Sequence, residues 1–331
     1  MRIFSGIQPT GRKHLGNYIG AITQYVAGQD RGEAIYCVVD LHALTVPYEP
    51  EQLRDAVYDT AAVLLAAGLD PERCIFFRQS DVVEHPELTW LLMSVTSFGD
   101  LTRMTQFKDK AGKQRERSTA GLFNYPVLMA ADVLAYRANE VPVGDDQRQH
   151  VELMRDVAEQ FNARFGETLV VPEVRIPQVG ARIMDLKFPD RKMSTTSGTD
   201  AGRVYVTDEP DAIAKKFRSA VTDTGSEVRR APDKPGITNL IEILAAVRGV
   251  SPEAIERGFE GSQYGPFKQA VADAVIEYLT PVRERYQDLR DDESGLERTL
   301  ALGAEKAHAI ASETLADVRE VMGVGPVRAR V

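Results

Sequence analysis

Short apolar runs alternate with longer amphipathic segments through the first half of the chain, and this alternation limits the fold more than any other feature. Four runs have the length and the β-branched or aromatic content of buried strands. They are residues 2–7, 34–40, 74–79 and 139–146. The segments between them, such as 49–71, have the apolar spacing of helices. Strands that are separated by helices predict an α/β fold with a Rossmann-type parallel sheet, covered by helices on both faces.

The pattern changes after about residue 188. The second half contains consecutive helical segments with short connections between them. They are residues 211–223, 236–249, 251–259, 264–289 and 293–323. We therefore expect a Rossmann-type nucleotide-binding domain over residues 1–188, an all-helical bundle domain over 189–294, and a C-terminal helix, 295–325, that packs back toward the first domain.

Charge and composition limit the function. The formal net charge of −9 argues against a protein whose whole surface binds nucleic acid. Residues 103–117 are a local exception, with six Lys or Arg against two acids, and they predict either a solvated loop or a basic patch. No apolar run reaches the roughly 18 residues of a membrane span, and the N-terminus lacks the apolar core of a signal peptide. Cys37 and Cys74 lie in apolar runs without metal-ligand spacing, so we expect a cytoplasmic protein with reduced thiols.

Polar residues follow the first predicted strand, at the end where such sheets bind ligands. A Gly- and Pro-containing turn at residues 8–11 leads to a helix that begins near His14. The N-terminus of a helix favours an anion such as phosphate, and Gly16 would let a base or ribose approach the backbone. His14 and Asn17 share one helix face. A plain capped helix with a surface histidine would explain the same residues.

Three further stretches offer chemistry, each with an ordinary alternative. Residues 191–200, RKMSTTSGTD, form either a Ser/Thr-rich linker between domains or a loop whose cation, Lys192, holds phosphate. Asp132 lies in an otherwise apolar helix, so its carboxylate needs a donor, which is either a ligand or a nearby arginine such as Arg137. The two acids after Gly144 either cap the next helix or bind a ribose hydroxyl.

Two of these stretches resemble known signatures. HLGN at residues 14–17 is similar to the HIGH signature of class I aminoacyl-tRNA synthetases, and KMSTT at 192–196 is similar to their KMSKS signature. The stretches FSGIQPTG, MAADVL, VPVGDDQRQHVEL, AVTD and KPGITNL follow one another as in bacterial tryptophanyl-tRNA synthetases. The resemblance covers nearly the whole chain, from Phe4 to about Gly323.

The resemblance implies a tryptophan–tRNA ligase. Such an enzyme forms tryptophanyl-adenylate and pyrophosphate from L-tryptophan and ATP, with Mg²⁺ bound through the phosphates and no metal site of its own. It then transfers the aminoacyl group to tRNA(Trp). The resemblance also implies a homodimer whose helical domain reads the anticodon, with residues 234–240, Arg148 and His150 as candidate contact surfaces. A tyrosyl-tRNA synthetase, and a paralogue with weakened charging that acts as a partner or regulatory protein, stay open as alternatives.

The same resemblance implies three groups of site residues. The catalytic residues are His14, Asn17, Lys110 and Lys192. The ATP site comprises Gln8, Pro9, Thr10, Gly16, Asn17, Gly144, Asp145, Asp146, Arg182, Ile183, Lys192, Met193, Ser194, Thr195 and Thr196. The tryptophan pocket comprises Phe4, His42, Gln106, Tyr125, Met129, Asp132, Val141, Val143 and Gln147. In that pocket, Asp132 would accept the indole N–H.

One position departs from the family pattern. Thr195 stands where the family has the second lysine of its loop. The loss of a cation that stabilises the transition state costs about 2–4 kcal/mol if nothing replaces it. Lys110 and the other cations of residues 103–117 are the expected replacement. The departure puts the rate of activation in question, and not the fold.

Overall fold

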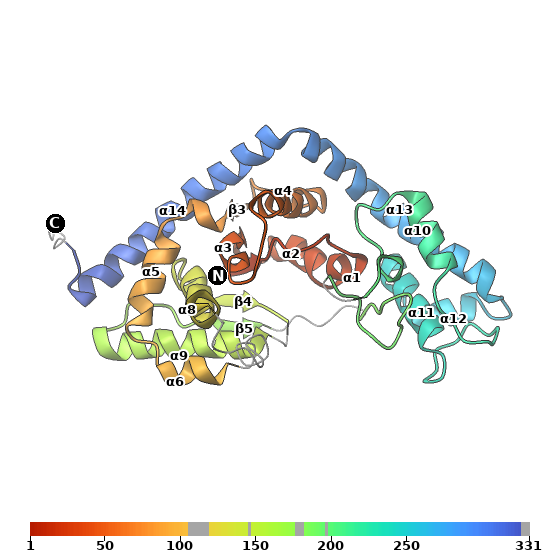
Figure 1. The fold of residues 1–331 in the computed structure, drawn as a ribbon, viewed down its shortest axis with the longest axis horizontal. Helices are drawn as coiled ribbons and strands as arrows, with labels where there is room; N and C mark the ends of the chain where they lie inside the picture. The colour runs from red at the N-terminus through yellow and green to blue at the C-terminus, as the bar shows by residue number, and fades with distance from the viewer. Residues whose placement is uncertain (105–118, 145–146, 176–181, 196–197, 326–331) are drawn as a thin grey trace.

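The computed structural model describes residues 1–104, 119–144, 147–175, 182–195 and 198–325. Within these residues, a five-stranded parallel sheet lies at the centre of the molecule (Figure 1). Its strands are β1 (Arg2–Ile7), β2 (Glu33–Val38), β3 (Cys74–Arg78), β4 (Glu140–Pro142) and β5 (Glu173–Arg175). The predicted parallel sheet is confirmed, and β5 is a strand that the sequence pattern did not indicate.

The order of the strands creates a crevice at the centre of the sheet. The order is β3-β2-β1-β4-β5, so the chain builds outward from β1 on one side and then continues with β4 on the other. Ile3 in β1 pairs with Ala34 of β2 and with Glu140 of β4. The carboxyl ends of β1 and β4 therefore flank the point where the winding reverses, which is where sheets of this kind bind ligands.

Both faces of the sheet are apolar because the strands are buried on both sides. Along β2, Tyr36 and Val38 belong to the core on one face, and Ile35 and Cys37 belong to the core on the other. Helix α4 (Pro50–Ala66) lies in the first core. Helices α5 (Glu84–Met93), α8 (Ala120–Leu134) and α9 (Arg148–Phe165) lie in the second. Cys37 and Cys74 are both buried and unpaired, as expected.

Shorter helices connect the strands. The helix that was expected near His14 consists of α1 (Leu15–Asn17), a π-helical segment (Tyr18–Ile22) and α2 (Thr23–Gly28). The others are α3 (Asp40–Ala43), α6 (Phe98–Arg103) and the 3₁₀ segments Gln79–Asp81 and Asp200–Gly202.

The last third of the chain is helical, as the sequence predicts. Its helices are α10 (Pro210–Arg218), α11 (Pro235–Arg248), α12 (Pro252–Gly258), α13 (Tyr264–Asp291) and α14 (Glu293–Met322). Helix α13 packs on α4, where Arg285 donates to the carbonyl of Ala66 at 2.8 Å. The apolar core of these helices is continuous with that of one sheet face. The division into domains at residue 188 therefore stays a prediction.

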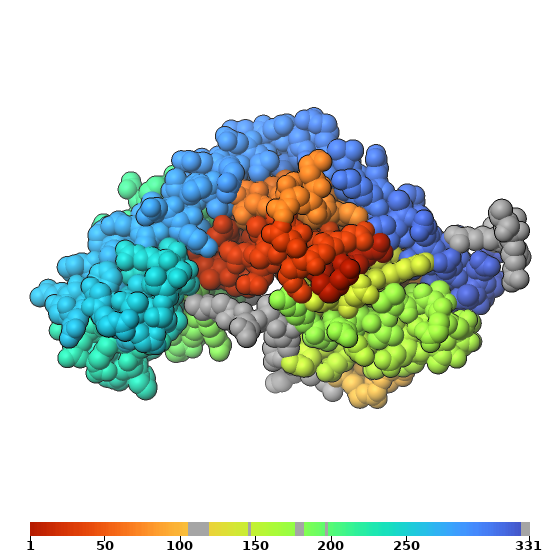
Figure 2. All heavy atoms as spheres, turned by 180° about the vertical axis from the view of Figure 1, so that it is seen from behind, coloured from red at the N-terminus to blue at the C-terminus, as the bar shows by residue number. Residues whose placement is uncertain are grey.

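Helices α13 and α14 meet at an angle and form an arch over the sheet (Figure 1). Helix α14 runs along β3, the outer strand, so closely that a Cβ at Gly303 would lie 1.8 Å from the carbonyl oxygen of Phe76. Glu297 of α14 also pairs with Arg78 at the end of β3 (Nη2–Oε1, 2.9 Å). The helix thus covers an edge that would otherwise be open to another strand. From the opposite side, the N-terminal segment lies under the arch, between α10–α13 at one end and α9 at the other (Figure 2).

Across the described parts of the chain, no helix has both the length and the apolar content that a membrane span needs.

Candidate active site

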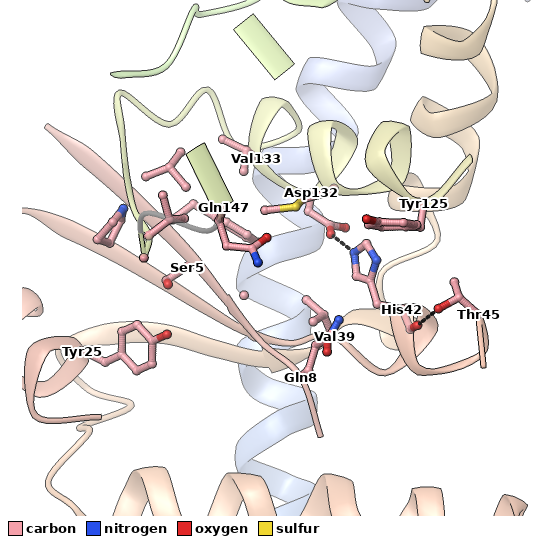
Figure 3. A pocket seen from close by; sticks show the side chains of 17 residues that line it. Ser5, Gln8, Tyr25, Val39, His42, Thr45, Tyr125, Asp132, Val133 and Gln147 are labelled. Atoms are coloured by element: carbon pink, nitrogen blue, oxygen red, sulfur yellow. Dashed lines mark hydrogen bonds and ion pairs between the residues drawn. The ribbon is translucent and has the colours of Figure 1, made fainter. Parts of the chain in front are cut away.

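A cavity of about 300 Å³ opens at the carboxyl ends of β1 and β4 (Figure 3). It lies at the point where the winding of the sheet reverses. Eight of the nine residues expected in the tryptophan pocket line it: Phe4, His42, Tyr125, Met129, Asp132, Val141, Val143 and Gln147. The ninth, Gln106, lies outside the described residues. The wall also includes residues that the sequence did not single out: Ser5, Gly6, Tyr25, Val39, Thr45, Val133 and Pro142.

Asp132 on α8 is the acidic residue of this wall, and its carboxylate is 2% exposed. Three side chains hold it. Oδ1 accepts from Gln79 Nε2 and from His85 Nδ1, each at 2.6 Å, and Oδ2 accepts from His42 Nε2 at 2.7 Å. Burial would raise the pKa of Asp132, but the charge and hydrogen bonds of His42 and His85 outweigh it and lower the pKa. Asp132 is therefore a carboxylate at neutral pH.

The neighbours of Asp132 fix the direction of each hydrogen bond. The Leu41 N–H donates to Oε1 of Gln79 at 3.0 Å, so the amide nitrogen of Gln79 faces Asp132. Because His85 Nδ1 donates to Asp132, its Nε2 accepts from the Tyr136 hydroxyl at 2.7 Å when the ring is neutral. Each carboxylate oxygen has about two acceptor positions. Within the described structure both positions on Oδ1 are filled, whereas Oδ2 retains one for a donor in the cavity.

Arg137 is not the partner of Asp132, so that alternative is wrong. The Arg137 guanidinium points away from the pocket toward α14, where it pairs with Asp317 and donates to the hydroxyl of Thr314 at 3.1 Å. The donors that sequence analysis missed are Gln79 and His85. They follow β3 and open α5, 53 and 47 residues away from Asp132 along the chain.

A second part of the site lies at the start of α1. His14 caps this helix: its Nδ1 accepts the Asn17 N–H at 3.2 Å, and Asn17 Oδ1 accepts the His14 N–H at 3.2 Å. His14 is only 2% exposed, so the alternative of a surface histidine is wrong, although the cap that it assumed is present. Its Nδ1 is an acceptor, and the proton of the neutral ring therefore lies on Nε2.

Cations surround His14 and keep it neutral. Burial and the charges of Arg203, Lys192 and Lys13 lower the pKa of His14 to about 4. Lys13 donates to the carbonyls of Gln8 (2.9 Å) and Thr10 (3.2 Å), and burial lowers its pKa to about 8. The arrangement is a neutral N–H donor among positive charges, which suits an anionic ligand.

The loop at 192–195 lies beside this first turn. The backbones of Lys192 and Met184 form an isolated antiparallel β-bridge. The Met193 N–H donates to the Ile183 carbonyl at 3.1 Å. Ile183 and Met193 are each 2% exposed and hold the loop on the apolar core, whereas Lys192 is exposed. The anchoring of Met193 in the core favours a loop of fixed position over a free linker between domains.

The segment after this loop pairs with the first turn. The Leu15 N–H donates to the Val204 carbonyl at 2.7 Å, and the Val206 N–H donates to the Lys13 carbonyl at 2.9 Å. The turn and the loop are therefore neighbours, although about 175 residues separate them along the chain. Gly16 packs against the His14 ring, since a Cβ there would lie 3.2 Å from its Cε1 and Nδ1.

The remaining expected ATP-site residues have different positions. Gln8 and Gly144 line the cavity, Pro9 is buried, and Thr10 and Arg182 are exposed. Ser194 and Thr195 are half-buried. The expectations for Lys110, Asp145, Asp146 and Thr196 fall outside the described residues, as does most of the basic stretch 103–117.

Two candidate anticodon contacts are wrong because their side chains are buried. His150 is 2% exposed and hydrogen-bonds the Tyr125 hydroxyl at 2.8 Å. Lys234 is 5% exposed and pairs with Asp223 at 2.9 Å. Asn239, from the same stretch as Lys234, bonds both the N–H and the carbonyl of Met184 (2.8 and 2.9 Å). This stretch therefore supports the base of the 192–195 loop.

A ligand cavity where the winding reverses, beside a helix N-terminus and a cation-bearing loop, defines a nucleotide-binding α/β protein. The family model for class I tRNA synthetases of tryptophan and tyrosine (W and Y) matches residues 1–280. A curated tryptophan–tRNA ligase 2 from Streptomyces avermitilis is 51% identical over 330 residues, 99% of this chain and 98% of its own length. The chain therefore belongs to the class I tRNA synthetase family.

Solved structures agree with this assignment. A tryptophanyl-tRNA synthetase from Campylobacter jejuni, complexed with ADP and tryptophan, has 33% identity and a TM-score of 0.86 and covers 98% of this chain and 100% of its own. A tyrosyl-tRNA synthetase from Aeropyrum pernix has 20% identity and a TM-score of 0.65, covering 91% of this chain and 88% of its own. That likeness shows the fold alone.

Proposed function

We propose that the protein is a tryptophan–tRNA ligase, which activates L-tryptophan with ATP and transfers it to tRNA(Trp). The observation that carries the proposal is the free acceptor position on Asp132 Oδ2, in a cavity that polar and apolar side chains line together. The indole nitrogen is a donor only, so it matches this position. The 51% identical ligase and the tryptophan-bound relative support the same substrate.

The geometry suggests how the site performs the first step. With the indole at Asp132, the carboxylate of tryptophan attacks the α-phosphorus of ATP, the new O–P bond forms, and the bond to the pyrophosphate oxygen breaks. Catalysis is positioning and charge stabilisation, because no side chain needs to act as a covalent nucleophile. His14 offers its Nε2 proton and Lys192 its charge to the phosphates, while Asn17 fixes the His14 ring. A terminal ribose hydroxyl of the tRNA then attacks the carbonyl carbon of the adenylate, the ester bond forms, the bond to phosphate breaks, and AMP leaves.

Mg²⁺ fits this site only as a companion of the nucleotide. The groups around His14 are cations, and in the described parts of the chain no cluster of three or more His, Cys, Asp or Glu could hold a metal. When bound to the phosphates, Mg²⁺ neutralises part of their charge. The protein's own residues would then bind the phosphate oxygens that the metal leaves free.

The homodimer and the cytoplasmic location are part of the same proposal. Val83, the residue before α5, and Trp90 within α5 are 69% and 72% exposed. A second copy that covers them would bury this surface. A sedimentation experiment that found only monomer at micromolar concentration would contradict the dimer.

Pyrophosphate exchange tests the amino acid. Tryptophan should drive exchange into ATP, whereas phenylalanine should fail because it leaves the acceptor on Asp132 unpaired. Exchange driven by tyrosine and not by tryptophan would favour the tyrosyl alternative and overturn the proposal. Charging of tRNA(Trp) tests the second step. Exchange with negligible charging would support the paralogue that acts as a partner protein.

A further inference from the structure

The loop at 192–196 lacks the second cation of its family, and the structure shows what the substituted side chain does. A Cβ built on Gly11, which has a φ of +60°, would lie 3.3 Å from the Cβ of Thr195. Thr195 therefore packs against the turn that follows β1. It closes the loop onto the turn by contact and brings no charge. Another residue has to supply the charge if the site holds three phosphates.

Arg203 lies at the right place to do so. It follows the loop, and its Nη2 donates to the Gly198 carbonyl at 3.0 Å while its Nη1 donates to the Tyr205 hydroxyl at 3.2 Å. Within the part of the chain that the structure describes, its Nε is buried without a hydrogen-bond partner. Among the described residues no carboxylate pairs with it. Arg12, which also lies near Tyr205, is in contrast neutralised by Asp208 at 3.3 Å.

The backbone pairing directs this charge toward the first turn. The backbones of Tyr205 and His14 form an isolated antiparallel β-bridge. The Leu15 N–H donates to the carbonyl of Val204, the residue next to Arg203. Consistent with this, the charge of Arg203 lowers the pKa of His14 by more than the charge of Lys192 does. Arg203 and Lys192 thus act on one point, at the cap of α1. Two cations that act on one point repel each other, and bound phosphate would relieve the repulsion.

We propose that Arg203 supplies, at the phosphate site, the positive charge that Thr195 does not. The inference rests on the proposed function, since it assumes that ATP binds between the first turn and the loop. A guanidinium suits the task because it stays charged and can donate two parallel hydrogen bonds to phosphate oxygens. This assignment differs from the expectation that Lys110 and the other cations of residues 103–117 replace the second lysine of the loop.

Tryptophan-dependent pyrophosphate exchange tests the proposal with four variants. Arg203→Gln should lower the exchange kcat by about 10²-fold, as expected for a lost transition-state donor. The gain in exchange from Thr195→Lys should be at least about tenfold larger in the Arg203→Gln background than in the native chain, because the two positions serve one charge. Arg191→Gln is the matched control. Arg191 neighbours Lys192, but its side chain is 73% exposed and pairs with Asp190, so exchange should stay within about twofold.

Each outcome decides between the inference and a structural role for Arg203. Loss of exchange without rescue by Thr195→Lys, or exchange within about threefold of native in Arg203→Gln, overturns the inference. Proton NMR of His14 provides a second readout, because the pKa of His14 should rise in Arg203→Gln if the charge lies at the cap. An unchanged His14 pKa also counts against it. If the native protein shows no exchange with tryptophan, the proposed function fails and not this assignment alone.

Discussion

Replacing Asp132 with asparagine separates the two tasks of this carboxylate. The asparagine oxygen takes the place of Oδ1, where it still accepts from Gln79 and His85. Its NH₂ then faces His42, whose Nε2 becomes an acceptor if the proton moves to Nδ1. All three hydrogen bonds survive without the help of the charge, at a cost of about 1 kcal/mol each. The variant should therefore fold, with a free energy of unfolding lowered by about 3 kcal/mol.

The same substitution also weakens the binding of tryptophan. The free position on Oδ2 becomes an N–H, so the indole donor meets another donor. The loss of a hydrogen bond to a charged group costs about 1.5–3 kcal/mol, which raises the KM for tryptophan by roughly tenfold to a hundredfold.

The assay is pyrophosphate exchange at varied tryptophan, with urea unfolding measured in parallel. Asp81→Asn is the control, because Asp81 pairs with Arg78 near the same end of β3 but does not line the cavity, so its KM should match the native value. A folded Asp132→Asn protein with a native KM would refute the reasoning.

Three further perturbations follow from the packing and the charges. Gly303→Ala should lower the melting temperature and reduce the free energy of unfolding by about 3 kcal/mol, the upper end for an overpacked site. Gly258→Ala is the control: a Cβ there meets open space, so the free energy of unfolding should rise by about 0.5–1 kcal/mol. Equal effects of the two substitutions in thermal melts would contradict the contact between α14 and β3. The pKa of His14 falls from 6.5 to about 4 on folding, so between these pH values only the unfolded chain holds the proton. Stability should drop by at most about 3 kcal/mol as the pH falls from 6.5 to 4, and urea titrations of His14→Gln should lack that part of the slope. Asn239→Ala removes two hydrogen bonds to Met184, so it should lower the free energy of unfolding by about 1–3 kcal/mol and raise the KM for ATP in exchange assays. A native KM would show that α11 does not position the 192–195 loop for ATP.

The sheet could be predicted because β1, β2 and β3 are five or six residues long and mostly apolar. Five of the six residues of β2 alternate between the two cores, which is the pattern of a strand that is buried on both faces. Strand β5 is different: it has only three residues, Glu173–Arg175, and its pairing with β4 holds it in the sheet more than its own composition does. Strand β4 is equally short and was indicated only as part of the longer run 139–146, because a three-residue strand by itself carries little of the burial signal that sequence patterns report.

The site shows a similar division. The two signatures are local in sequence, so His14, Asn17 and the 192–195 loop could be named in advance. The support of Asp132 comes from Gln79 and His85, whose roles exist only once α5 and the segment after β3 pack against α8. The burial of His150 has the same origin, because its side of α9 meets Tyr125 across a helix pair. Polar residues look alike in sequence whether they end in solvent or in a network.

The closure of β3 by α14 has a consequence for synthesis. The strand ends at Arg78 and the helix that covers it begins at Glu293, more than 200 residues later. During translation the outer ladder of the strand stays bare until the helix has left the ribosome. A nascent chain stalled in that interval exposes a template for strand addition, so its survival depends on a chaperone or on rapid completion.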